Sequence, residues 1–72
     1  MHYPQTAEMK TVTFSVVLDH NHAWYLAQFL KRVSFSTCED HSDPTNKEEP
    51  HYMSAALETV RAALADAGYA PR

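Results

Sequence analysis

The chain has 72 residues and a single cysteine, with six Lys and Arg against nine acidic residues and a net charge of −3. These values exclude several domains and an internal disulfide, and they disfavour non-specific nucleic-acid binding, which depends on neutralising phosphates. Because so small a domain buries only about 60% of its unfolded surface, we expect a metal or a second subunit to supplement its core.

The cellular compartment can be predicted from the unpaired cysteine and from the length of the apolar segments. A lone unpaired cysteine, Cys38, fits a reducing compartment better than an extracellular one. No apolar run approaches the about 18 residues of a membrane span, and residues 1–10 lack the apolar segment of a signal peptide. We therefore expect a cytoplasmic protein that does not contact a membrane.

The N-terminal part of the chain divides into a tail and a predicted strand. Residues 1–10 show no period, which is typical of a flexible tail. Residues 11–18 alternate strictly and are rich in β-branched side chains. This pattern predicts a β-strand with one apolar face, made of Val12, Phe14, Val16 and Leu18.

Two helices are predicted after this strand. Asp19 to Asn21 can cap a helix over about 22–33, whose buried stripe would be Ala23, Leu26, Ala27, Leu30 and Val33. A second helix is predicted over about 51–67, beginning near Glu48 or Glu49 and ending at Gly68. Its apolar stripe is the most complete in the chain: Met53, Ala56, Leu57, Val60, Ala63, Leu64 and Ala67.

Residues 34–49 join the two predicted helices as an acidic loop. Residues 34–38 tolerate a short extended piece, and five acids then face only Lys47 as a counter-charge. A structureless connection of this length is uncommon in a compact domain and is often functional.

The order strand, helix, helix predicts a single α+β domain over residues 11–72. A lone strand must pair with the tail, with residues 34–38, or with the same strand of a second copy. The third alternative gives a homodimer with a two-stranded ribbon, similar to the ribbon-helix-helix arrangement.

Two stretches resemble a group of short uncharacterised proteins of proteobacterial genomes and prophages. They are residues 23–33, AWYLAQFLKRV, and residues 60–72, VRAALADAGYAPR. The acidic segment 39–49 departs from the compact connector of that group. The resemblance implies a mobile-element context, in which small acidic proteins bind host machinery, with anti-CRISPR inhibitors as the most concrete example.

No catalytic signature is found, and we expect no enzyme activity and no cofactor. The side chains of His20, His22, Cys38 and His41 are types that zinc accepts, but their spacing matches no known site, and a solvated cap and loop explain them equally. Cys38 with His41 also lacks the rest of a nucleophilic site. We therefore assign no metal site.

Two binding hypotheses follow. In the first, acids and exposed aromatic residues dock on a basic groove of a host protein or nucleoprotein complex. The residues expected to bind this partner are Trp24, Tyr25, Glu39, Asp40, Asp43, Glu48, Glu49, Tyr52 and Glu58. The alternative is a ribbon-helix-helix-like dimeric DNA-binding regulator, although direct nucleic-acid binding is disfavoured because Lys10 is the only cation of the strand.

Overall fold

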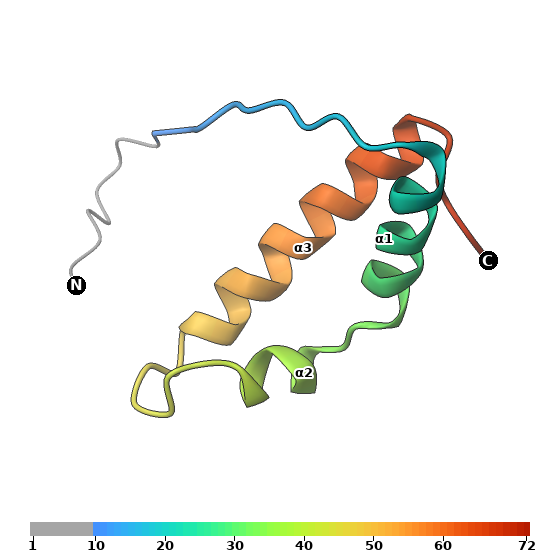
Figure 1. The fold of residues 1–72 in the computed structure, drawn as a ribbon. Helices are drawn as coiled ribbons and strands as arrows, with labels where there is room; N and C mark the ends of the chain where they lie inside the picture. Colours follow the sequence, from blue (N-terminus) through green and yellow to red (C-terminus); the bar gives the residue numbers. More distant parts are fainter. Residues whose placement is uncertain (1–9) are drawn as a thin grey trace.

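A computed structural model describes residues 10–72, which form three helices (Figure 1). Helix α1 spans His20–Arg32, α2 spans Phe35–Asp40, and α3 spans Glu49–Asp66. Both α1 and α2 pack against the long helix α3. The flexible tail predicted for residues 1–10 lies outside the described residues except for Lys10, so the fold described below begins at that residue.

The predicted α+β class is wrong: the described residues contain three helices and no strand. Residues 10–19, which we call the arm, are extended but pair with no other described segment. No strand forms among these residues because residues 34–38, which the sequence offered as a pairing partner, are not extended and present no strand edge to the arm. The strand predicted for residues 11–18 is therefore wrong, because alternation specifies two faces of an extended segment and carries no information about a pairing partner.

Helix α1 has the predicted Asp19 cap but begins two residues earlier than predicted, at His20. The Asp19 carboxylate accepts a hydrogen bond of 2.8 Å from the backbone N–H of His22, which satisfies one of the free amides at the helix start. Lys31 and Arg32 occupy the last turn, where cations are favoured. The face toward α3 buries Ala23, Ala27 and Leu30.

Helix α2 replaces the extended piece that the sequence allowed over residues 34–38. The Ser34 hydroxyl accepts a hydrogen bond of 3.3 Å from the backbone N–H of Thr37. In return, the backbone N–H of Ser34 donates to the Thr37 hydroxyl at 3.4 Å, which completes a capping box. This reciprocal cap starts a helix that the β-branched Thr37 alone would not indicate.

Helix α3 ends at the predicted glycine. Gly68 has φ +99°, the left-handed conformation that favours glycine. Its N–H donates to the Ala65 carbonyl, and the N–H of Tyr69 donates to the Leu64 carbonyl at 2.8 Å, which together form a Schellman motif. This turn directs Tyr69 back toward α1.

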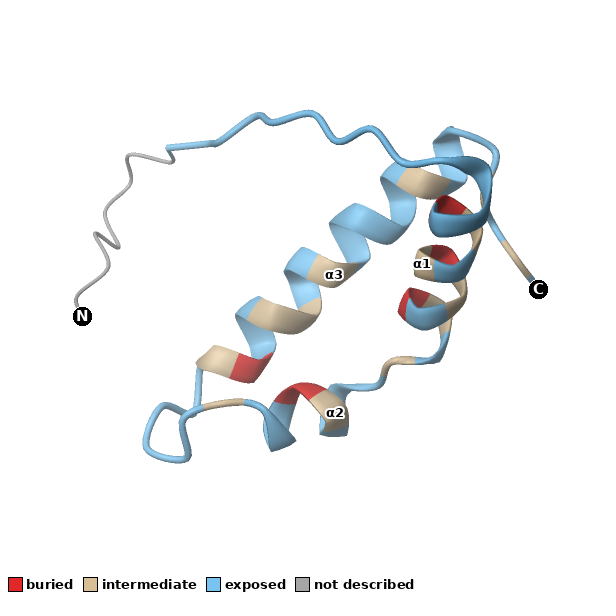
Figure 2. Ribbon diagram, in the orientation of Figure 1, coloured by how far each residue is buried: buried red, intermediate tan, exposed pale blue. Residues whose placement is uncertain are grey.

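The buried core is small and lies at the junctions of α1 and α2 with α3 (Figure 2). The predicted α1 stripe is buried at Ala23, Ala27 and Leu30 and half-buried at Leu26 and Val33. The α3 stripe is not buried: Met53, Leu57 and Leu64 are only half-buried, and Val60 is 39% exposed. The Cα radius of gyration is 14.2 Å, whereas a compact chain of this length has about 11 Å. The single chain is therefore open, with apolar surface on α3 that nothing in residues 10–72 covers.

Candidate functional site: an acidic turn and an apolar groove

Residues 39–49, which we call the acidic turn, connect the end of α2 to the start of α3. Its conformation is fixed by side chains that bond its own backbone. The Glu49 carboxylate accepts a 2.6 Å hydrogen bond from the N–H of Asp43, and the Asn46 side chain accepts one of 3.0 Å from the N–H of Glu48. These bonds span the turn, so the connection is an ordered turn and not the structureless loop that the sequence suggested.

Asp43 is the centre of the turn. Its carboxylate accepts hydrogen bonds from the backbone N–H of Thr45 at 2.9 Å and from the Thr45 hydroxyl at 2.8 Å. These two bonds, the backbone one first, lower the pKa of Asp43 below its ordinary value of 3.8 because they favour the ionised form. Asp43 therefore stays negatively charged even in mild acid.

The acids of the turn are not neutralised by ion pairs within residues 10–72. The ion pairs found there join His22 to Asp19 and Arg61 to Glu58, both far from the turn. Four of the five acids of the turn are exposed, and Glu49 is half-buried. The exposed ones are Glu39, Asp40, Asp43 and Glu48. The turn therefore presents negative charge to solvent.

A hollow of about 390 Å³ opens between the acidic turn and the adjacent helix ends. Its walls include the carboxylates of Glu39 and Asp43 together with the side chain of Lys47. The rings of Phe35 and His51 also line it, with their centroids 4.9 Å apart. The hollow thus combines two acids and one lysine with an aromatic wall, and the surplus of negative charge favours a cationic side chain.

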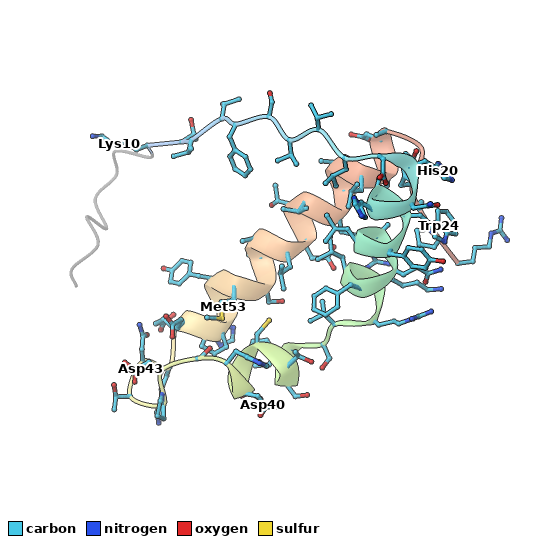
Figure 3. All side chains as sticks on the ribbon, in the orientation of Figure 1. Lys10, His20, Trp24, Asp40, Asp43 and Met53 are labelled. Carbon is cyan, nitrogen blue, oxygen red and sulfur yellow. The ribbon has the colours of Figure 1, made fainter. Side chains whose placement is uncertain are left out.

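The structure does not bring all nine predicted partner-binding residues together (Figure 3). Trp24 lies at the opposite end of the molecule from Asp40 and Asp43. Its ring packs edge-on against Tyr69, with centroids 6.5 Å apart, so Trp24 is half-buried and anchors the chain end on α1. Tyr25 follows it on α1 and is 68% exposed.

The other two predicted residues lie on α3. Tyr52 is 63% exposed in the first turns of the helix, near the acidic turn. Glu58 contacts Arg61 at 3.4 Å, the pairing that the sequence predicted, so its charge is compensated. The acidic turn is therefore one surface. Tyr52 lies in the helix that follows the turn and does not line its hollow, and Trp24, Tyr25 and Glu58 lie elsewhere.

The histidine and cysteine side chains are also divided between two places. His20 and His22 both lie in the first turn of α1. The Nδ1 atom of His20 contacts the Tyr69 hydroxyl at 2.9 Å, and His22 pairs with Asp19. Cys38 and His41 lie on α2 and just after it, where His41 Nδ1 donates to the Thr37 carbonyl at 2.9 Å. Among the described residues, no three His, Cys, Asp or Glu side chains gather as a metal ion would require.

An apolar cavity of about 400 Å³ lies where α1, α2 and α3 meet. Cys38 is buried beside it, and His41 reaches its rim. No hydrogen bond joins these two side chains within the described residues. The remaining lining residues are apolar apart from Thr37: Phe29, Val33, Met53, Ala56 and Leu57.

A second apolar feature, which the sequence reasoning missed, lies between the arm and the C-terminal half of α3. We call it the arm groove; its volume is about 500 Å³. It is lined by Val12, Thr13, Phe14, Val16, Leu18, Leu26, Thr59, Val60, Ala63, Leu64 and Ala67. The alternation in the arm indicated which side chains would share this face, but not that the face would remain open.

Over residues 10–72, these features define a small three-helix unit with two exposed surfaces, one acidic and one apolar. The chain belongs to a family described as a family of unknown function (DUF7706), whose profile matches residues 3–72. The resemblance to an uncharacterised family is thereby confirmed. Neither the curated proteins nor the solved structures include a match. No helix within the described residues is long and apolar enough to cross a membrane.

Proposed function

We propose that this protein is a non-enzymatic binding protein whose acidic turn docks on a basic surface of a host protein or nucleoprotein complex. The observation that carries the proposal is the hollow at the turn, which is lined by Glu39 and Asp43 and bounded by Phe35. An Arg or Lys side chain of the partner enters this hollow, where carboxylates and an aromatic ring stabilise its charge.

The fixed conformation of the acidic turn supports the same proposal. Hydrogen bonds from Asp43, Thr45 and Glu48 to side chains of the turn hold its backbone before any partner arrives. A preformed turn loses little conformational entropy on binding, so more of the interaction energy appears as affinity. The unpaired acids around it attract a basic partner from a distance and increase the association rate.

The biological setting is part of the proposal. We infer that the protein acts in the cytoplasm and that it derives from a mobile element, where its effect on the partner is inhibition or modulation. An anti-CRISPR-type inhibitor is the most concrete form of this function. The acidic turn would compete with nucleic acid for the basic groove of such a complex, since both present closely spaced negative charges.

Affinity capture from a bacterial lysate tests the proposal with a matched pair of charge reversals. Glu39→Lys places a cation in the hollow, whereas Asp66→Lys makes the same charge change at the far end of α3. Both sites are exposed at a helix C-terminus, where Lys is favourable, so both variants should fold.

We expect the wild-type protein and Asp66→Lys to capture the same partner at moderate salt, and Glu39→Lys to lose it. Equal capture by all three proteins would contradict the proposal. Loss from both variants would also contradict it, because net charge and not the hollow would then determine binding.

Direct DNA binding remains the alternative prediction. A mobility-shift assay in low salt distinguishes the two functions: a DNA-binding regulator retards DNA, whereas the proposed binding protein leaves it free. The net charge of −3 favours the second outcome.

A further inference from the structure

The arm exposes large apolar side chains that no other part of the described chain covers. Val12 is 82% exposed, Phe14 74% and Val16 63%. No hydrogen bond joins residues 10–18 to the rest of the described chain. Exposed apolar surface of this kind, gathered on one side of a segment, marks an interaction site in a soluble protein.

The opposite wall of the arm groove is the apolar face of α3. Val60 is 39% exposed there, and Ala63 and Ala67 are exposed beside it. None of the lining residues carries an ionisable group. The groove therefore suits an apolar occupant and gains nothing from a charged one.

We propose that the occupant is a second copy of this chain. The arm of each copy fills the arm groove of the other copy. The arm carries four large apolar side chains on the side that lines the groove, Val12, Phe14, Val16 and Leu18, which is the chemistry that the groove accepts. Reciprocal insertion uses the same surface on both copies, as a two-fold symmetric dimer requires.

The exposed apolar area can be compared with the area of a stable interface. Burying one whole Val, Leu or Phe side chain removes roughly 60–120 Å² from water. Five such residues line the groove and are at least 39% exposed: Val12, Phe14, Val16, Leu18 and Val60. Their exposed fractions together equal about three whole side chains, or roughly 180–360 Å² per copy. The rest of the about 800 Å² per partner of a stable interface comes from Thr59, Ala63, Ala67 and the other exposed residues of the arm.

Charge also permits a second copy of an acidic chain. The acidic turn ends where α3 begins, at Glu49, whereas the groove lies around Ala63. At 1.5 Å per residue, the two features are about 21 Å apart along α3. Like charges on the two copies therefore need not approach each other when the grooves join, and the acidic turns stay free for the partner proposed above.

The mass of the protein in solution tests this proposal, measured by light scattering and sedimentation from about 1 to 500 µM. Two matched pairs of variants locate the interface. Phe14→Glu lies in the groove, and Val17→Glu lies on the other face of the same arm, where Val17 is 96% exposed. Ala63→Glu lies in the groove, and Ala62→Glu is exposed on α3 outside it.

We expect the wild type to have twice the chain mass of 8.2 kDa. Phe14→Glu and Ala63→Glu should weaken dimerisation by at least about tenfold, because each would bury an unpaired carboxylate. Val17→Glu and Ala62→Glu should change it by less than about threefold. Glu is a good helix former, so the pair on α3 remains informative if a change in the arm disturbs folding.

A wild-type protein that stays monomeric throughout this range would overturn the proposal. A dimer that withstands both groove variants, or that is disrupted equally by the control variants, would overturn the assignment of its interface. These measurements use the protein alone, so their outcome is independent of whether the acidic turn captures a host partner.

Discussion

Single residues determine where the helices of this chain end. Gly68 is an example, because its φ of +99° permits the turn that closes α3 and brings Tyr69 onto α1. A Cβ atom at this position would meet no other atom within 4 Å. The requirement for glycine is therefore one of backbone conformation and not of space.

Gly68→Ala should lower the free energy of unfolding by about 1–2 kcal/mol, the cost of a left-handed conformation for a residue with a Cβ atom. Gly68→Asn should cost less, since Asn tolerates this region better. Chemical denaturation followed by circular dichroism measures both values. Equal stability of wild type and Gly68→Ala would show that the turn at Gly68 does not form.

Asp43 permits a prediction about pH. Its pKa is lowered in the folded chain, so the ionised turn contributes stability that is present above the ordinary pKa of 3.8 and is lost as the pH falls through the folded value. Titration of the Asp43 carboxyl by NMR should give a midpoint below 3.8. Thr45→Val should move the midpoint only part of the way back, because the backbone N–H of residue 45 still donates.

An Asp43 midpoint at or above 3.8 would contradict the turn geometry.

At the scale of elements, the helices carry the small core of the chain. Leu30 is 4% exposed on the face of α1 toward α3, whereas Tyr25 on the same helix is 68% exposed. Leu30→Ala should therefore destabilise the protein by about 2–3 kcal/mol, the lower part of the range for buried leucines, because an open core can relax around the cavity.

Tyr25→Ala is the matched control and should cost less than about 1 kcal/mol, since its side chain is mostly in water. Thermal and denaturant unfolding of both variants measure the difference. A Tyr25→Ala variant as unstable as Leu30→Ala would mean that α1 packs on a different face.

The elements also show which parts of the structure the sequence can predict. Helices α1 and α3 were predicted to within about two residues at each end, because their periodicity, the Asp19 cap and Gly68 are local signals. Helix α2 was not predicted, because Phe35 and Thr37 also tolerate a strand and only the capping box of Ser34 with Thr37 indicates a helix. The predicted strand failed because alternation specifies two faces of an extended segment but not a partner.

The sequence predicted which residues belong to the candidate site but not which of them lie close together. The acids of the turn were identified from the sequence, but the sequence could not show that two of them, Glu39 and Asp43, line one hollow. Trp24 was expected on a binding surface, and its contact with Tyr69 could not be anticipated, since 45 residues, 69 − 24, separate them in the chain.

At the scale of the whole molecule, the radius of gyration and the uncovered apolar face of α3 support the proposal that a second copy packs against residues 10–72. An NMR experiment on a mixture of ¹³C-labelled and unlabelled chains tests this account most directly, because an isotope filter selects contacts between copies. We predict intermolecular contacts from the Phe14 ring of one copy to the methyl groups of Val60 and Ala63 of the other. Their absence, with Phe14 contacting solvent or its own chain only, would contradict the account.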